Sequence, residues 1–190
     1  MRPIVIAAAL ALAAAPVAGG AVLSVGAKAP DFQTQGAVGG KTFTLKLSEQ
    51  LKKGPVVLYF FPAAFTPVCT IEAHQFADAT DDFKKAGAQV IGMANDPIDK
   101  LADFSVKECR NKFPVAVATP ALINAYDVKL GPIPNLPPDV VAKMAGRSSR
   151  TSYVIAPGGK VLLAYSDMSP DAHVSETLAA VKNWKARRPK

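Results

Sequence analysis

Short apolar runs alternate with amphipathic segments along most of the chain. Val56–Phe61 (VVLYFF) and Ala88–Ala94 (AQVIGMA) are continuous apolar runs rich in strand-forming residues, which is typical of strands buried on both faces. Two later runs, Thr151–Ala156 and Lys160–Tyr165, flank the turn sequence Pro-Gly-Gly at 157–159. Together they predict a β-hairpin near the end of the chain.

The intervening segments carry a stripe of residues at helical spacing. Residues 68–86 repeat in steps of three and four, at positions 69, 72, 76, 79 and 83, and predict a helix. Residues 97–112 predict a second helix, with Asp96 as its cap and Pro97 in its first position. A last helix is expected over residues 171–187, with four residues on one face: Val174, Leu178, Val181 and Trp184.

The order of these elements predicts the class of fold. Strand–helix–strand order followed by a terminal hairpin indicates an α/β or α+β sheet domain. Residues 131–147 carry four prolines and two glycines, so we expect a loop there, with one helical turn at Val140–Met144.

The N-terminus has the composition of an export signal. Arg2 precedes a run of 15 apolar residues from Ile4 to Ala18, and small residues follow, as in a secretory signal peptide. The run is shorter than the roughly 20 residues that a membrane span needs. We therefore expect a signal peptide over 1–20, cleaved within 18–21, and one domain over 22–190. The mature protein would be exported to a bacterial periplasm without stable membrane insertion; an uncleaved anchor is the alternative.

Composition excludes several classes of protein. The chain has 190 residues, 49% of them hydrophobic, and a formal charge of +7, which suits one domain with a real core and excludes a disordered chain. The basic C-terminal residues match the negative end of the last helix dipole and are expected to face solvent. The basic segments lack the aromatic interleaving of a nucleic-acid site. Two cysteines and two histidines are too few for a usual four-ligand zinc site.

Cys69 is the strongest candidate for chemistry. It follows the first buried strand directly and lies in the first turn of the predicted helix, where helix N–H groups and the positive dipole end favour a thiolate. It shares its helical face with Glu72, so its sulfur should point towards the domain body. Thr66 can supply a hydroxyl to sulfur or substrate, and Pro62 can fix the turn. Spacing alone leaves open a reactive or a structural cysteine.

These residues resemble a known family. Pro62-x-x-x-Thr66-x-x-Cys69 matches the P-x-x-x-T-x-x-C signature of peroxiredoxins, thiol peroxidases of the AhpC/TSA type. The segments 26–32, 69–72 and 150–155 also look like the family's opening segment, its C-T-x-E continuation and its arginine-bearing strand. The chain is most similar to the bacterioferritin comigratory protein or peroxiredoxin Q branch. The resemblance implies a thioredoxin-like α/β fold, with a central mixed β-sheet flanked by helices.

The resemblance also implies a role for each matching residue. Cys69 would be the peroxidatic cysteine, which attacks a hydroperoxide and becomes a sulfenic acid. Arg150 would stabilise the thiolate and the leaving oxygen. Thr66 would orient the peroxide, Pro62 would shield the site and Glu72 would hold the arginine.

Cys109 would be the resolving cysteine. Many peroxiredoxin Q members carry that cysteine five residues after the peroxidatic one, where this chain has His74. Other members place it on a later helix, and Cys109 falls on the predicted helix 97–112. It would close an intramolecular disulfide with Cys69, for which the two segments must approach. The alternative is an inert thiol, with an external thiol resolving the enzyme.

The function expected is thus a thiol-dependent peroxidase. Its partners would be a hydroperoxide and a thioredoxin-like or other thiol reductant; no cofactor, metal or nucleic acid is expected, and the protein could be a monomer or a dimer. A disulfide oxidoreductase is the first alternative, although it usually needs Cys-x-x-Cys, and this chain has Glu72 three residues after Cys69. A metal chaperone and a non-catalytic protein on a related fold are the others. Position alone does not separate Arg150 from Arg147, whereas the motif selects Arg150.

Overall fold

The first predicted strand lies near the middle of a seven-stranded mixed sheet, in the order β2-β1-β5-β4-β3-β6-β7. The computed structural model describes residues 22–132 and 137–187. The strands are β1 (Gln33–Val38), β2 (Lys41–Lys46), β3 (Val56–Phe60), β4 (Gln89–Ala94), β5 (Val115–Val117), β6 (Thr151–Ile155) and β7 (Val161–Ser166). The helices are α1 (Leu47–Leu51), α2 (Pro67–Ala86), α3 (Ile98–Lys107), α4 (Pro120–Ala125), α5 (Pro138–Met144) and α6 (His173–Ala186).

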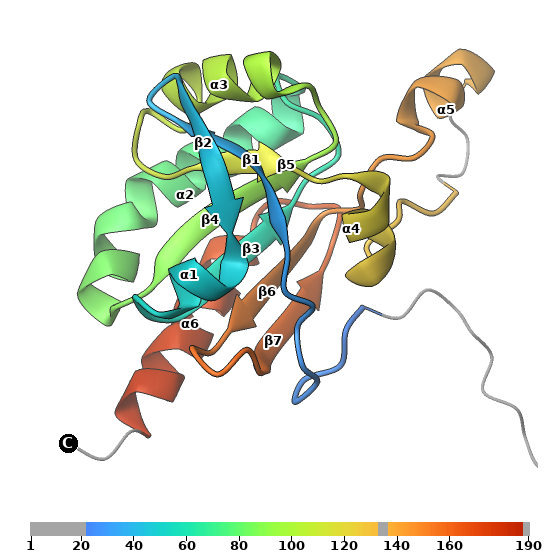
Figure 1. Ribbon diagram of the computed structural model, residues 1–190. Coiled ribbons are helices and arrows are strands. Elements are labelled where there is room, and N and C mark those ends of the chain that lie inside the picture. The colour runs from blue at the N-terminus through green and yellow to red at the C-terminus, as the bar shows by residue number, and fades with distance from the viewer. Residues whose placement is uncertain (1–21, 133–136, 188–190) are drawn as a thin grey trace, which may run out of the picture.

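Helices cover both faces of this sheet, as the two apolar clusters show (Figure 1). Strand β3 pairs in parallel with β4 and antiparallel with β6, and all its side chains are buried. Tyr59 faces a cluster shared with α2, α3 and α6, whereas Leu58 and Phe60 face a cluster shared with α1 and α4. The mixed α/β architecture predicted from the sequence is confirmed.

Helix α2 begins and ends where its sequence directs. Pro67 occupies its first turn, where a missing N–H costs nothing, and Gly87 ends it with a left-handed φ of 85°. The predicted helix over 68–86 is therefore confirmed almost to the residue. The strands predicted at 56–61, 88–94, 151–156 and 160–165 correspond to β3, β4, β6 and β7.

The predicted helix over 97–112 is too long. Helix α3 ends at Lys107, because Arg110 and Asn111 adopt left-handed φ angles of 51° and 58° that an α-helix cannot continue. Cys109 therefore lies in the turn after α3, not on it. Asp96 does not cap α3 either: Pro97 holds the N-cap position, and the Asp96 carboxylate accepts a hydrogen bond from the Ala64 N–H.

The proline-rich segment forms more helix than the single turn expected. Helix α5 runs over Pro138–Met144, has no buried residue and projects from the body of the molecule (Figure 1). The predicted signal peptide over 1–20, its cleavage region and residues 133–136 of the loop lie outside the described residues. Within the described ranges, no helix is both long and apolar enough to cross a membrane.

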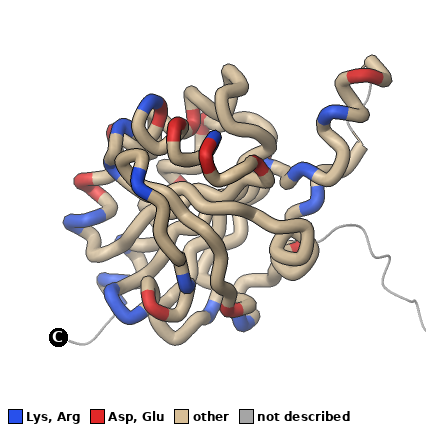
Figure 2. Tube along the Cα trace, turned by 45° about the horizontal axis from the view of Figure 1, so that its top comes forward, with Lys and Arg blue, Asp and Glu red and all other residues tan. Residues whose placement is uncertain are grey.

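Charged residues of both signs lie beside one another on the outer elements (Figure 2). Several form ion pairs one helical turn apart, such as Lys107 with Asp103 and Lys143 with Asp139. Such exposed pairs contribute little to stability and much to solubility. The net positive charge therefore belongs to a mixed surface.

Candidate active site

Cys69 is buried at the start of α2, with 2% of its surface exposed. The first hydrogen bond within the helix joins the Thr70 N–H to the Thr66 carbonyl. The N–H groups of Val68 and Cys69 therefore precede the intrahelical bonds, and helix geometry leaves them for other acceptors. This arrangement suits a thiolate or an oxygen anion at the helix terminus. The sulfur points into the domain, as the sequence predicts.

Arg150 brings its guanidinium to this sulfur from the residue before β6. Its Nη2 lies 3.5 Å from the Cys69 Sγ, its Nη1 donates to the Glu72 carboxylate, and its Nε donates to the Met168 carbonyl at 3.0 Å. Arg150 is almost fully buried. Because partners hold the rigid guanidinium on three sides, its position relative to the sulfur is fixed.

Burial dominates the electrostatics of this cluster. It raises the pKa of Glu72 to about 8, although the charge and hydrogen bond of Arg150 oppose the rise. Burial also disfavours the charge on Arg150, but Glu72 and Cys69 outweigh that effect and raise the pKa of the guanidinium. The arginine therefore stays positive beside the sulfur, in a dry environment where its charge acts strongly.

The loop between β3 and α2 shapes the approach to Cys69. Pro62 is buried, whereas Phe65 is exposed and adopts a left-handed φ of 65°. The Thr66 hydroxyl donates to the Ala63 carbonyl at 3.0 Å, not to the sulfur. The hydroxyl oxygen of Thr66 can still accept a hydrogen bond, so it remains available to a bound hydroperoxide.

Asp96 anchors that loop, a role that the sequence does not predict. Its Oδ2 accepts the Ala64 N–H at 2.9 Å, and its Oδ1 lies 2.9 Å from both Lys100 and Arg147. Burial by itself raises its pKa, but these donors outweigh burial and hold the pKa of Asp96 below its usual value. Arg147 thus serves Asp96, while Arg150 serves Cys69, which separates the two arginines that position alone left equivalent.

His173 is the second residue that the sequence does not identify. It is fully buried at the start of α6, and its Nδ1 lies 2.8 Å from the Ser152 hydroxyl and 3.8 Å from the Glu72 Oε1. No local motif reveals it, because β6 and α2 bring its neighbours from distant parts of the chain. A histidine on the buried side of an amphipathic helix is the only available signal. His74, the other histidine, pairs with Glu108 at 2.8 Å.

Cys109 is reduced and fully buried in the same apolar cluster that contains Cys69. Burial raises the pKa of the Cys109 thiol, and the nearby Glu108 charge raises it further. In this conformation Cys109 is therefore a neutral thiol within the core. The structure brings Cys69, Arg150 and Glu72 into direct contact, with Thr66 and Pro62 on the adjoining loop, and it places Cys109 apart from that contact group.

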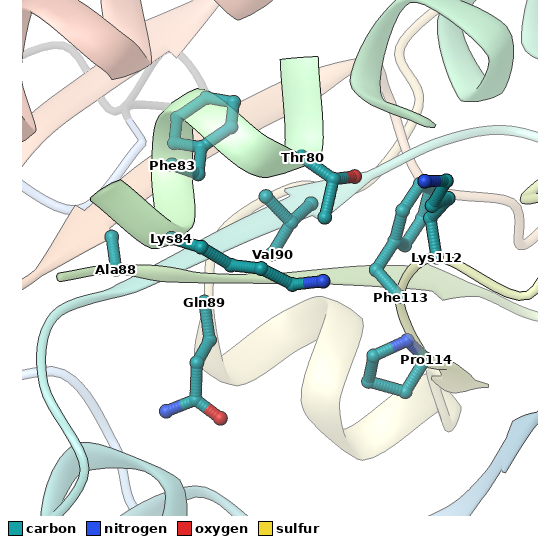
Figure 3. A pocket seen from close by; sticks show the side chains of 9 residues that line it. All are labelled: Thr80, Phe83, Lys84, Ala88, Gln89, Val90, Lys112, Phe113 and Pro114. Carbon is teal, nitrogen blue, oxygen red and sulfur yellow. The ribbon is translucent and has the colours of Figure 1, made fainter. Parts of the chain in front are cut away.

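A separate cavity of about 170 Å³ lies at the other end of α2 (Figure 3). Its wall includes Phe83 and Val90, and Lys84 and Lys112 lie at its rim. None of the predicted site residues lines it, and it holds no cysteine. The described ranges also contain no group of three or more histidine, cysteine or acidic side chains that could hold a metal ion. The chemistry of the chain therefore centres on Cys69.

A buried cysteine at a helix N-terminus, in contact with an arginine, on a mixed thioredoxin-like sheet, defines a class of thiol peroxidase. Comparison with known proteins agrees: the model of the AhpC/TSA family matches residues 25–164. The chain belongs to this family, the peroxiredoxins, and is a thiol-dependent peroxidase.

Relatives of known structure support the same assignment. The chloroplastic peroxiredoxin Q of Sedum lineare is 34% identical over 151 residues, which cover 75% of each protein. The crystal structure of the peroxidoxin BcpB from Mycobacterium tuberculosis is 33% identical, with a TM-score of 0.70, covering 87% of this chain and 98% of that one. Peroxiredoxin Q of Xanthomonas campestris is 26% identical, with a TM-score of 0.66, covering 80% of this chain and 90% of that one.

Proposed function

We propose that Cys69 is the peroxidatic cysteine of this peroxidase. Its thiolate attacks one oxygen of a hydroperoxide, so that an S–O bond forms while the O–O bond breaks. The departing oxygen leaves as an alkoxide or hydroxide and takes up a proton to become an alcohol or water. The sulfur is oxidised by two electrons to a sulfenic acid, and the peroxide is reduced by two.

The observation that carries this proposal is the contact of 3.5 Å between the Arg150 guanidinium and the Cys69 sulfur. A fixed positive charge beside the sulfur stabilises the thiolate before attack, and it stabilises the negative charge on the leaving oxygen during attack. Both groups are buried, so water competes little with this interaction. Glu72 keeps the guanidinium in place through its carboxylate.

Thr66 and Pro62 complete the proposed site. The Thr66 hydroxyl oxygen accepts the hydrogen bond of the peroxide O–H, and the Cys69 N–H donates to the same substrate at the helix N-terminus. Pro62 lacks an N–H and so offers no competing donor, while its buried ring keeps water from the sulfur. The substrate class is hydrogen peroxide or an organic hydroperoxide, because exposed Phe65 provides an apolar surface at the entrance.

Cys109 is proposed as the resolving cysteine. Its thiolate attacks the sulfur of the Cys69 sulfenic acid, an S–S bond forms, and the sulfenic oxygen leaves as water. Membership of one apolar cluster supports this assignment, as does the free state of both thiols. An external dithiol, of thioredoxin-like or other type, then reduces the disulfide and returns the enzyme to its thiol form.

Resolution requires the turn that carries Cys109 to move. Two ion pairs join this turn to α2: His74 with Glu108 at 2.8 Å, and Asp78 with Arg110 at 2.7 Å. Both pairs are partly exposed, so each contributes about 0–1 kcal/mol to holding the turn. The left-handed residues that end α3 make this segment the natural place for a local opening.

Peroxide consumption by three variants in dithiothreitol tests the assignment. Cys69→Ser should abolish turnover. Cys109→Ser should still reduce one equivalent of peroxide and accumulate a sulfenic acid on Cys69, which dimedone traps. Full activity in Cys69→Ser would refute the proposal, and unchanged disulfide formation in Cys109→Ser would refute the resolving role.

Export to a bacterial periplasm is proposed from the sequence of residues 1–20 alone. Its support is the charged, apolar and small-residue order of that segment. N-terminal sequencing of the protein secreted by a bacterial host tests it, with cleavage expected within 18–21. Recovery of the intact N-terminus in the membrane fraction would favour the anchor instead.

A further inference from the structure

A layer of buried polar side chains lies beneath Arg150. Glu72 from α2, Ser152 from β6 and His173 from α6 are all fully buried. Ser152 and Arg150 are two residues apart, so their side chains lie on the same face of β6. Buried polar groups need partners, and those of this layer come from three separate elements.

The hydrogen bonds of His173 define its tautomer. Its Nε2 lies 3.0 Å from the Asp167 carbonyl, which can only accept, so Nε2 carries the proton. Its Nδ1 lies 2.8 Å from the Ser152 hydroxyl. Burial lowers the pKa of His173, and the charge of Arg150 lowers it further, against the effect of the Asp167 carbonyl. In the neutral ring, Nδ1 is therefore an acceptor for Ser152.

Glu72 uses only one of its two carboxylate oxygens. Oε2 accepts from Arg150, whereas the buried Oε1 has no hydrogen-bond partner among the described residues. The nearest ring nitrogen to it is His173 Nδ1, at 3.8 Å. Because the lone pair of Nδ1, not a proton, faces this side of the layer, His173 does not compete with Arg150 for the carboxylate.

We infer that His173 is a positioning residue of the peroxidase: it holds Glu72, and through Glu72 the Arg150 guanidinium, against the Cys69 sulfur. The inference rests on the proposed roles of those three residues. The ring is anchored at both nitrogens and so forms a fixed wall beside Oε1. This wall excludes water from the carboxylate and leaves Arg150 as its only donor among the described residues.

The ionisable groups around the imidazole come from every element packed against it. Glu72 faces it from α2, and Arg150 from the start of β6. The Tyr165 ring packs edge-on from β7, with the ring centroids 4.8 Å apart, and Asp167 follows in the next turn. The ring is therefore packed as well as hydrogen-bonded, which allows it to hold its neighbours.

Three substitutions separate the two nitrogens of His173. His173→Leu removes both anchors and leaves Ser152 and the Asp167 carbonyl unpaired. His173→Asn keeps a polar group at the place of Nδ1, beside Ser152. His173→Gln reaches the place of Nε2 and keeps a donor for Asp167. The Ser152-facing nitrogen is the one that borders Glu72, so we expect rescue by Asn and little rescue by Gln.

Two single-turnover measurements report on the site. One is the second-order rate constant for Cys69 oxidation by hydrogen peroxide, and the other is the pH profile of Cys69 alkylation by iodoacetamide. His173→Leu should lower the first roughly tenfold, as expected for the misplacement of about one charged hydrogen bond. It should also move the alkylation profile to higher pH, because the arginine no longer stabilises the thiolate fully.

A milder variant and a matched control complete the test. Ser152→Ala removes only the Nδ1 partner and should shift both readouts in the same direction by less. Thr177→Val is the control, because Thr177 is equally buried one turn along α6 and donates to the His173 carbonyl at 2.6 Å. It should lower the melting temperature without moving the alkylation profile.

The outcomes are distinct. A lower melting temperature in His173→Leu, with an unchanged rate constant and an unchanged profile, would overturn the inference and leave His173 as packing. Equal rescue by Gln and Asn would also overturn it, since the Glu72 side would then have no special role. Failure of the proposed function is seen separately, as peroxide turnover in Cys69→Ser.

Discussion

Arg150→Lys is the substitution that most directly tests the electrostatic part of this account. Lysine keeps the positive charge but has no rigid fork, so one ammonium cannot reach the Met168 carbonyl, Glu72 and Cys69 together. Glu72 holds the stronger attraction, because it is buried and accepts directly from the guanidinium. The ammonium should therefore remain with Glu72 and lose its contact with the sulfur.

The magnitude follows from the lost contact. A hydrogen bond to a charged group contributes about 1.5–3 kcal/mol. Loss of that stabilisation in the transition state slows the reaction by roughly 10- to 150-fold, at about 1.4 kcal/mol per tenfold. The assay is competition for hydrogen peroxide between the reduced enzyme and a reporter peroxidase, which measures the rate constant for the first oxidation alone.

Arg147→Lys is the matched comparison. Arg147 contacts Asp96 and the Asn95 carbonyl, so the loss of its fork should cost less than about 1 kcal/mol, or under roughly fivefold in rate. A rate constant for Arg150→Lys within twofold of the wild type would refute the reasoning. An equal loss in both lysine variants would show that the loop, not the contact with the sulfur, governs the rate.

Three further predictions follow from the buried and paired groups. Folded Glu72 keeps its proton up to about pH 8, against a reference of 4.5, so the folded state binds more protons than the unfolded chain in that range; stability should fall as the pH rises through it, and urea unfolding should show a flatter pH dependence for Glu72→Gln. Asp96→Asn should lower the free energy of unfolding by about 1–3 kcal/mol, measured with urea, because a buried group loses its charge beside two cations. Asp78→Asn should speed disulfide formation by up to roughly fivefold, measured by acid quench and mass spectrometry, because Arg110 loses its partner. A rate unchanged or slower would contradict the proposed opening of that turn.

The buried parts of the fold were predictable because their signals are local. The continuous apolar run of β3, the stripe of α2 with Pro67 and Gly87 at its ends, and the final hairpin each follow from neighbouring residues. Strands β1 and β2 were missed because their sequences alternate weakly: only Ala37 and Leu45 are fully buried apolar side chains within them. The short β5, α1 and α4 depend on packing against the rest of the sheet.

The candidate site divides in the same way. The peroxiredoxin motif identifies Cys69 and Arg150, and the structure brings them together. Asp96 and His173 act on that motif across large sequence separations, so no local pattern could identify them. The end of α3 was wrong because left-handed backbone at Arg110, a non-glycine residue, has no distinctive sequence signal.

Mass spectrometry after a single peroxide pulse tests the central claim, that Cys69 reduces hydroperoxides. The reduced protein receives one equivalent of hydrogen peroxide and is digested without reductant. The account predicts a linked peptide pair containing Cys69 and Cys109. Sulfenic or sulfinic acid on Cys69 with Cys109 intact would keep the peroxidase and contradict the resolving role. Two unmodified thiols after the pulse would contradict the claim itself.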